Sequence, residues 1–389
     1  MKKVIYVLNS TYLLGGASKS FLLLLNGIAQ CGMHPIVIVP DRNGLYSVLV
    51  QMGIEVIDIT YRNNTYPHYN SLKDILLFLP RLFARRLVNW NAVRKLYAQF
   101  SNSEISLVHT NVSVIDIGFR LAQRLHVPHV YHIREYGDLD FHEIYYPTSV
   151  AFHAMWCKSS YSICITKHIQ SHHGLTGDSK SVVIYNGIDV PPVDIDSLLK
   201  EDYFLFAGRI DESKGVHVLL EAYANYLQHS SLQRRLVIAG DPDKMAYLKK
   251  LQRFIKEHQI ENKVKFLGGR KDIYELMQHA IAIVIPSRFE GFGRCMAEAM
   301  MNGCLVVAHN TAGLKEQFDN GVLVTGREIG LRYMTTSELS ERLIQIDSMT
   351  NKDMKQYMAD AYQTAYSLYT SQINVQSVYR FYNQIIAKG

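Results

Sequence analysis

The sequence has few cysteines, and their arrangement argues against a framework of disulfides. Five occur among 389 residues, with no Cys-x-x-Cys pair: Cys31, Cys157, Cys164, Cys295 and Cys304. An odd and dispersed set indicates neither a disulfide scaffold nor a structural zinc site. We therefore expect this chain in a reducing compartment.

Long apolar runs are also absent. No stretch approaches the roughly 18 residues needed to cross a bilayer. The first ten residues begin like a signal peptide, but their apolar run ends after Leu8 and no small-residue cleavage site follows. We expect a cytoplasmic protein, free or at the inner face of the plasma membrane.

The net charge of the chain is small as well. The chain has 41 Lys and Arg against 35 Asp and Glu, a net charge of +6. This gives no argument for binding nucleic acid, although it permits an anionic ligand or a membrane surface. Hydrophobic residues at 48% and charged residues at 20% exclude a disordered or fibrous chain.

Short apolar runs alternate with stretches of helical period. This alternation favours parallel sheets covered on both faces by helices, and two such arrays predict an α/β protein with two Rossmann-like, doubly wound domains. The expected strands are Val4–Leu8, Pro35–Val39, Val56–Ile59, Leu107–His109, His129–Ile133 and Ser162–Ile165, then Tyr203–Ala207, Arg235–Ala239, Val264–Leu267, Ala282–Ile285 and Leu305–Ala308.

Turn-forming residues and two adjacent prolines interrupt this pattern at 186–194. The interruption predicts a border between domains. We expect an N-terminal domain over 1–190, a linker over 191–200, a second domain over 201–365, and a C-terminal helix over 366–389 that packs back on the N-terminal domain.

Two cations follow the first strand of the second array. The strand ends at Ala207, Gly208 lets the backbone turn, and Arg209 and Lys214 precede a helix expected to begin near Val216. Guanidinium and ammonium groups suit phosphate oxygens, so the pair could neutralise a diphosphate without a metal. The alternative is an ordinary solvated basic loop.

A second segment, 283–300, has the order strand, glycine-rich loop, helix. Gly291 and Gly293 permit close approach of a ligand to the backbone, and the positive N-terminus of the helix points to the same place. Glu290 and Glu298 could accept hydrogen bonds from sugar or ribose hydroxyls. Their spacing alone recurs about once by chance in a chain of this composition, so the surrounding Glu-Gly-Phe-Gly carries the argument.

Together these segments resemble the donor-binding half of retaining glycosyltransferases of family 4, which have the GT-B architecture of two Rossmann-like domains facing across a cleft. The resemblance covers nearly the whole chain and is most specific between Phe206 and Glu316. Further matching segments are Gly15–Ser18, Val130–Glu135, Val183–Asp189, Ile238–Asp241, Val264–Gly268 and Thr311–Glu316.

The resemblance implies roles for individual residues. Arg209 and Lys214 would bind the donor diphosphate, and Gly16 would approach it from the N-terminal domain. Glu298 would hold the ribose hydroxyls and Glu290 the transferred sugar. The backbone around Phe292, Gly293 and Arg294 would complete the sugar-phosphate pocket. His132 would lie near the reacting centre.

It also implies a reaction. The donor would be a nucleoside-diphosphate sugar of the UDP or GDP type, with no cofactor and no metal. The sugar would pass with retained configuration, by a front-face mechanism, to a saccharide acceptor, expected to be lipid-linked, in bacterial surface polysaccharide synthesis. Arg294 occupies a position where an apolar residue is common in the family. We therefore infer no identity for the donor sugar from this residue.

Other interpretations stay open at this point. His132 could be an ordinary hydrogen-bonded core residue, and Glu135 could either orient its ring or cap the next turn. Three Asp-x-Asp triplets, at 138–140, 194–196 and 241–243, could suggest a metal, although chance explains about one of them. A sugar-nucleotide epimerase, a phosphorylase of similar architecture and a non-catalytic nucleotide-sugar-binding protein are the competing functions.

The segment 72–100 is both basic and apolar. It holds six Lys and Arg against Asp74, a balance of 6 − 1 = +5, with large apolar residues between them. Such a surface could rest on anionic headgroups. The alternative is two ordinary crossover helices whose apolar faces cover the sheet.

Overall fold

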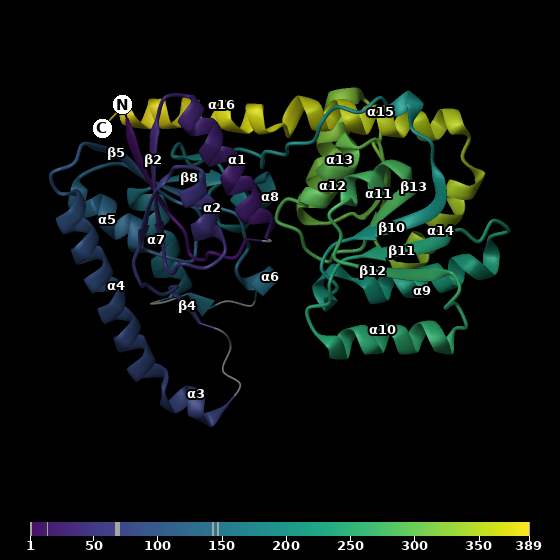
Figure 1. The fold of residues 1–389 in the computed structure, drawn as a ribbon, viewed down its shortest axis with the longest axis horizontal. Helices are drawn as coiled ribbons and strands as arrows, with labels where there is room; N and C mark the ends of the chain where they lie inside the picture. Colours follow the sequence, from purple (N-terminus) through teal and green to yellow (C-terminus); the bar gives the residue numbers. More distant parts are fainter. Residues whose placement is uncertain (1, 14, 67–70, 142–143, 146–147, 389) are drawn as a thin grey trace. The chain divides into compact units, whose positions relative to one another are not determined.

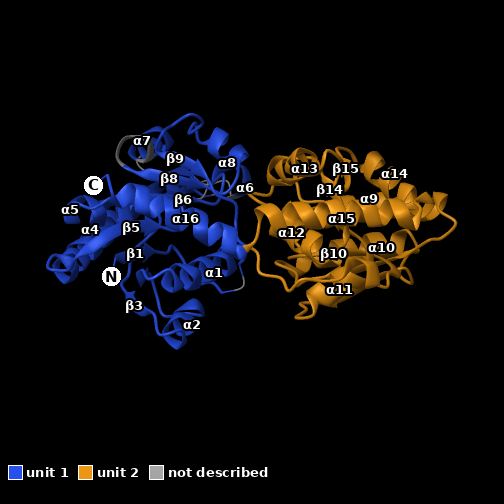
Figure 2. Cartoon of the chain, turned by 90° about the horizontal axis from the view of Figure 1, so that it is seen from above, with its two compact units in different colours: residues 1–187, 371–389 blue, residues 188–370 orange. Residues whose placement is uncertain are grey.

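The structure is a computed structural model that describes residues 2–13, 15–66, 71–141, 144–145 and 148–388. It contains two compact units (Figure 2). Unit 1 comprises Met1–Gly187 and Ser371–Gly389, and unit 2 comprises Ile188–Thr370. Each is built on its own parallel sheet with helices packed against it, which confirms the predicted α/β class with two Rossmann-like domains.

Unit 1 is built on a seven-stranded parallel sheet with the order β3-β2-β1-β5-β6-β8-β9. Parallel neighbours require crossover connections, and most of these connections contain helices. The strands are β1 (Lys3–Val7), β2 (His34–Val39), β3 (Glu55–Asp58), β5 (Ile105–Thr110), β6 (His129–Ile133), β8 (Tyr161–Cys164) and β9 (Ser181–Val183).

Helices surround this sheet, and a separate antiparallel pair, β4 (Thr65–Tyr66) with β7 (Ile144–Tyr145), lies in the connections. The helices of unit 1 are α1 (Gly16–Gln30), α2 (Leu45–Gln51), α3 (Leu72–Leu76), α4 (Phe78–Phe100), α5 (Ile117–Leu125), α6 (Asp138–Phe141), α7 (Ser149–Ser159), α8 (Lys167–His172) and α16 (Ser371–Ile386) (Figure 1).

Unit 2 has a six-stranded parallel sheet with the order β12-β11-β10-β13-β14-β15. Of its two central strands, β13 is buried along its whole length and β10 is buried over Tyr203–Phe206, as expected of a parallel sheet covered on both faces. The strands are β10 (Glu201–Ala207), β11 (Arg235–Ala239), β12 (Val264–Gly268), β13 (Ala280–Ile285), β14 (Leu305–His309) and β15 (Leu331–Tyr333).

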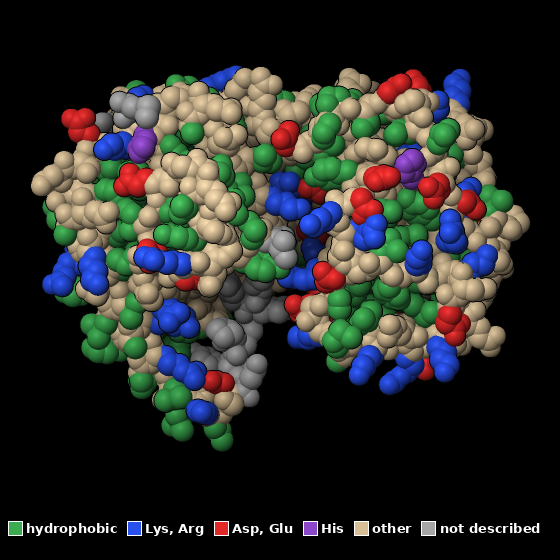
Figure 3. All heavy atoms as spheres, in the orientation of Figure 1, with side chains coloured by type: hydrophobic (Ala, Val, Ile, Leu, Met, Phe, Trp, Pro, Cys, Tyr) green, Lys and Arg blue, Asp and Glu red, His purple; other side chains and the backbone are tan. Residues whose placement is uncertain are grey.

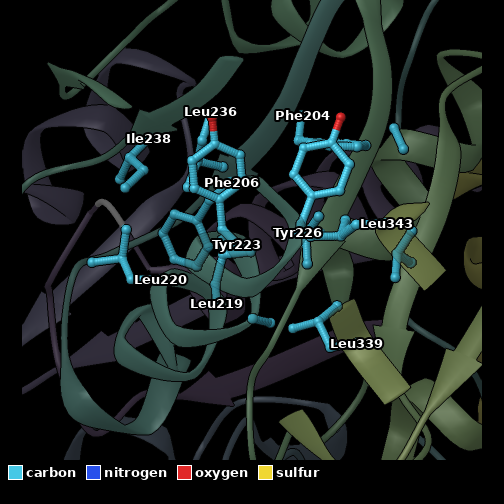
Figure 4. Close-up of a cluster of buried hydrophobic side chains, with 14 of the residues drawn as sticks. Phe204, Phe206, Leu219, Leu220, Tyr223, Tyr226, Leu236, Ile238, Leu339 and Leu343 are labelled. Atoms are coloured by element: carbon cyan, nitrogen blue, oxygen red, sulfur yellow. The ribbon is translucent and has the colours of Figure 1, made fainter. Parts of the chain in front are cut away.

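One face of this sheet is closed by aromatic and aliphatic side chains of α9 and α14 (Figure 4). Phe204 and Phe206 of β10 lie against Tyr223 and Tyr226 of α9 in this cluster. The helical segments of unit 2 are η1 (Ile195–Ser197), η2 (Glu212–Lys214), α9 (Val216–His229), α10 (Met245–Glu257), α11 (Ile273–His279), α12 (Arg294–Met301), α13 (Ala312–Thr325), α14 (Thr336–Ser348) and α15 (Asn351–Leu368).

All eleven predicted strands coincide with observed strands to within a few residues. The prediction omitted β4, β7, β9 and β15, which have two or three residues each. Strands this short are below the length at which a run of apolar residues can be recognised.

Four of the five cysteine side chains lie in the described part of the chain. Cys31, Cys164, Cys295 and Cys304 are free thiols there, and the side chain of Cys157 lies outside the described residues. None of the helices in the described ranges is both long and apolar enough to cross a membrane.

The C-terminal helix α16 belongs to unit 1, where it packs against α1 and β5 (Figure 1). Its Tyr382 is fully buried, and the hydroxyl lies 2.6 Å from His109 Nδ1 on β5 and 3.3 Å from the Tyr6 hydroxyl on β1. The hydroxyl of Tyr382, near the C-terminus, thus lies in a core built by strands from the N-terminal part of the chain.

We predict that Tyr382→Phe lowers the free energy of unfolding of unit 1 by about 1–3 kcal/mol, because it leaves buried His109 Nδ1 without this partner. Both tryptophans of the chain, Trp90 and Trp156, lie within the sequence of unit 1, so tryptophan fluorescence during denaturant unfolding measures this unit. Tyr379→Phe, on the same helix but half-buried, is the matched control. Equal effects of the two substitutions would contradict the prediction.

Candidate functional site

In unit 2 the sheet order reverses between β10 and β13, which are neighbours although β11 and β12 lie between them in the sequence. In open α/β sheets, ligands bind beyond the carboxyl ends of the strands at such a switch point. The loops that follow β10 and β13 are the two segments that the sequence analysis selected. Backbone contact joins them, since Arg288 N donates to Ser213 O at 3.1 Å.

A close ion pair lies where these loops meet. Lys214 Nζ is 2.5 Å from Glu290 Oε1, and the two side chains are 27% and 20% exposed. Burial alone would lower the pKa of Lys214, but the carboxylates of Glu290 and Asp211 outweigh burial and raise that pKa. Lys214 is therefore a fixed positive charge in a partly desolvated place.

Two glycines permit the close packing of this region. Gly215 has φ = +69°, and a Cβ there would lie 2.2 Å from the Pro286 carbonyl oxygen. Gly293 has φ = +83°, and a Cβ there would lie 2.5 Å from a methyl group of Leu314 on α13. Since any side chain would force these elements apart, the loops depend on glycine at both positions.

The other predicted donor residues are held by neighbours in the same region. Arg209 pairs with Asp211, with Nε 2.6 Å from Oδ2, and its side chain is half exposed. Arg294 and Glu298, one turn apart on α12, form an ion pair of 3.0 Å and are both largely buried. Arg294 thus fixes the Glu298 carboxylate. The sequence analysis noted that Arg294 departs from the family pattern, but it did not predict this ion pair.

Gln317 of α13 is a positioning residue that the sequence analysis missed. It is 1% exposed, and its Nε2 donates to the carbonyl oxygens of Phe292 at 2.5 Å and Gly293 at 3.1 Å. These bonds fix the backbone just before α12, whose N-terminus opens toward the loop. In the sequence, the only indication of this role is that Gln317 directly follows segment 311–316, which resembles the family.

In unit 1, His132 lies within β6 and is completely buried. Arg134 Nη2 donates to His132 Nδ1 at 3.3 Å, and the same guanidinium donates to Asn111 Oδ1 and Asn186 Oδ1. Because a guanidinium only donates, Nδ1 must accept, and the proton of the neutral ring lies on Nε2. In the described part of the chain, Nε2 has no hydrogen-bond partner.

Glu135 does not orient this histidine. Its Oε1 accepts hydrogen bonds from the backbone N–H and the hydroxyl of Ser113, at 2.8 and 2.7 Å. The side chain that forms a hydrogen bond with the ring is that of Arg134. Gly16, the remaining predicted residue of unit 1, is exposed as the first residue of α1, which follows β1.

The residues that could suggest a metal have local structural partners. Asp140 accepts from the backbone N–H groups of Tyr136 and Gly137, Asp194 accepts from Asp196 N, and Asp241 accepts from Gly269 N. Within the ranges that the structure describes, no three His, Cys, Asp or Glu side chains are grouped so that they could hold a metal ion.

A cavity of about 580 Å³ lies elsewhere in unit 2, lined mainly by residues of α14 and α15. It contains none of the predicted site residues. Arg327, its most prominent cation, is already held by both carboxylate oxygens of Asp360 at 2.8 Å. We therefore place the candidate site at the switch point and not in this cavity.

Comparison with protein families gives two adjoining matches. The model described as Glycosyltransferase Family 4 matches residues 14–191, and the model described as Glycosyl transferases group 1 matches residues 194–360. The switch-point loops of unit 2 lie within the second match, and His132 lies within the first.

Individual proteins agree with these matches. An uncharacterized glycosyltransferase of Methanocaldococcus jannaschii is 27% identical over 70% of this chain and 76% of its own length. The N-acetylgalactosamine-N,N'-diacetylbacillosaminyl-diphospho-undecaprenol 4-alpha-N-acetylgalactosaminyltransferase of Campylobacter jejuni is 32% identical over 37% of this chain and 40% of its own. Anabaena HepE, solved with UDP, has the same fold, with a TM-score of 0.78, 22% identity, and coverage of 99% of this chain and 100% of HepE.

The buried histidines of unit 1 predict an acid-sensitive fold. Burial lowers the pKa of His129 to about 3 and that of His173 to about 4, and it lowers the pKa values of His109 and His132 well below 6.5. Below pH 6.5 the unfolded chain therefore binds protons that the folded unit does not. Stability is complete above this pH and falls as the pH falls, by up to about 1.4 kcal/mol per pH unit for each histidine.

The test compares the pH dependence of unfolding in three proteins, followed by tryptophan fluorescence between pH 6 and pH 5. His129→Gln should make the slope shallower than in the wild type, whatever its effect on stability at neutral pH. His126→Asn is the control, because His126 is exposed and its φ of +55° suits asparagine. An unchanged slope in His129→Gln would show that this histidine does not contribute.

Proposed function

We propose a specific reaction for this chain, which belongs to glycosyltransferase family 4 and has the GT-B fold. It transfers a sugar from a nucleoside-diphosphate sugar to a hydroxyl group of a saccharide acceptor, with retained configuration and without a metal ion. The single observation that carries this proposal is the Lys214–Glu290 ion pair, which joins the loops after β10 and β13 at the switch point.

The charges at this point suit a sugar diphosphate. Lys214 and Arg209 supply positive charge for the diphosphate, and the N-terminus of α12 after Gly293 adds backbone N–H groups. Glu290 accepts hydrogen bonds from hydroxyls of the transferred sugar. Glu298, held by Arg294, accepts them from the ribose.

The same charges would favour the transfer step. As the bond between sugar and phosphate breaks, negative charge grows on the departing diphosphate, so fixed cations stabilise the transition state more than the ground state. The leaving phosphate would accept the proton of the attacking hydroxyl, as in the front-face mechanism that the family resemblance implies. This assignment needs no carboxylate nucleophile.

His132 acts in this proposal as a hydrogen-bond donor and not as a base. Its Nδ1 is occupied by Arg134, and burial followed by the charge of Arg134 lowers its pKa well below the ordinary value. A neutral ring with its proton on Nε2 can donate to a hydroxyl of the donor sugar or the acceptor. Gly16, at the start of α1, would approach the donor diphosphate by the family resemblance alone.

Support for the acceptor comes from one relative and from the family resemblance. The Campylobacter relative is named for a saccharide carried on diphospho-undecaprenol. Together with the family resemblance, this supports a lipid-linked acceptor in bacterial surface polysaccharide synthesis. The complexes of HepE with UDP and with UDP-glucose support a UDP-sugar as the first donor to assay.

We predict that Arg209→Ala and Lys214→Ala each lower kcat/KM for transfer on the order of 10²-fold or more, because each removes a charge-assisted contact to the diphosphate. The assay follows the saccharide product by mass spectrometry after a screen of donors by thermal shift. EDTA is present throughout, since the proposal assigns neutralisation of the diphosphate to side chains.

Arg235→Ala is the matched control for this experiment. Arg235 is exposed at the amino end of β11, opposite the switch-point edge, and should leave kcat/KM unchanged. Loss of wild-type activity in EDTA, or variants of Arg209 and Lys214 as active as Arg235→Ala, would contradict the proposal. Free sugar, an epimerised nucleotide sugar, phosphorolysis or binding without turnover would indicate the competing functions.

Glu290→Gln should lower kcat more than it weakens binding of the nucleoside diphosphate, because the proposal places Glu290 on the sugar. Transfer kinetics and calorimetric titration with UDP measure the two quantities. Glu221→Gln, at an exposed position of α9, is the control and should change neither. A larger loss of UDP affinity than of kcat would move Glu290 from the sugar to the diphosphate.

A further inference from the structure

The α3–α4 region of unit 1 presents large apolar side chains to solvent. Seven of them have exposures between 50% and 80% and form what we call the α3–α4 surface: Leu72, Ile75, Leu76, Leu79, Phe83, Leu87 and Trp90. Soluble monomers rarely expose so many large apolar side chains in one place. Figure 3 shows hydrophobic and Lys or Arg side chains together over these helices.

The exposed residues of α4 lie on one side of the helix. Leu79, Phe83, Leu87 and Trp90 recur at intervals of four, four and three residues, which places them in a single stripe. The helix buries a different face, and only in its C-terminal half, where it packs against α5. The buried residues are Asn89, Ala92, Val93, Leu96 and Phe100.

Basic side chains accompany this stripe. On the helical spacing of α4, Arg86 and Arg94 fall on the same side as the exposed apolar residues, and both are exposed. The Arg94 guanidinium lies 5.5 Å from the centre of the Trp90 ring. With Asp74 as the one acidic residue of the sequence 72–100, the segment carries a net charge of +5.

Exposed apolar and basic side chains together favour one kind of partner. An anionic phospholipid bilayer offers apolar chains for the leucines and phenylalanine, headgroup phosphates for the arginines, and an interfacial region that suits tryptophan. A second copy of the chain fits poorly, because symmetric contact would bring two surfaces of +5 charge together. A spanning segment is not required, since an amphipathic helix lies in the plane of the interface.

We propose that unit 1 docks on anionic membranes through the α3–α4 surface, with α3 and the exposed side of α4 from Leu79 to Arg94 in the headgroup layer. The C-terminal half of α4 stays packed on α5 and holds the surface in place. The proposal concerns binding to lipid alone and does not depend on the transfer reaction. Vesicle binding without a donor or acceptor therefore tests it separately from the proposed function.

The experiment measures flotation of the full chain with vesicles of phosphatidylglycerol and phosphatidylcholine in equal parts, and with vesicles of phosphatidylcholine alone. Binding should be at least tenfold stronger to the anionic vesicles and should weaken at high salt. Leu79→Ser with Phe83→Ser should weaken binding at least tenfold. Arg86→Gln with Arg94→Gln should also weaken it at least tenfold. All four positions are exposed, so the fold should be retained.

Leu199→Ser with Leu323→Ser is the matched control, since these leucines are 80% and 77% exposed outside the α3–α4 surface. It should bind vesicles like the wild type. A blue shift of tryptophan fluorescence on binding should disappear in Trp90→Phe. Equal binding to both vesicle types, no binding, or equal loss in the control would overturn the proposal. Dimerisation in sedimentation that the α3–α4 variants abolish would overturn it in favour of a second copy.

Discussion

Strand polarity is the constraint on which the candidate site depends. All carboxyl ends of a parallel sheet lie at one edge, and the reversal of order in unit 2 makes β10 and β13 neighbours. This brings Lys214 to Glu290 across 76 residues of sequence. An unpaired ammonium group would be costly in so desolvated a place, and the carboxylate offsets that cost. The contact that joins the two loops therefore also keeps a cation at the sheet edge.

The arginines of the two units act on their neighbours in different ways. In unit 1, Arg134 can only donate, so it fixes the proton of His132 on Nε2 and holds the ring neutral. In unit 2, Arg294 holds Glu298 through an ion pair between two largely buried groups. In both places the guanidinium determines the hydrogen-bonding capacity of a neighbour. Replacement of either arginine would thus change a residue that the sequence alone marks as functional.

The sequence predicts those parts of the structure that produce a local pattern. Continuous apolar runs located the central strands, and glycines and charges after them located the loops that hold Arg209, Lys214 and Glu290. The pairing of Lys214 with Glu290 follows from strand order, which no local pattern contains. Gln317 and Arg134 were missed because a single polar residue next to a strand or within a helix has no periodicity. For Glu135 the sequence left two roles open and did not identify the partner Ser113, which approaches it from a distant segment.

The helix α4 shows why composition alone could not decide between a membrane surface and an ordinary crossover helix. Both expectations describe part of it, since the C-terminal half buries Ala92, Val93 and Leu96 while the N-terminal half leaves Leu79 and Phe83 in solvent. A helix that only covered a sheet would direct its large apolar residues toward the sheet along its whole length. Here the apolar stripe and the buried face lie on different sides of one continuous helix. Packing within unit 1 therefore explains the second half of α4. In the first half, Phe78 and Arg85 contact the segment around β4, and the exposed apolar stripe is the part for which we propose a membrane partner.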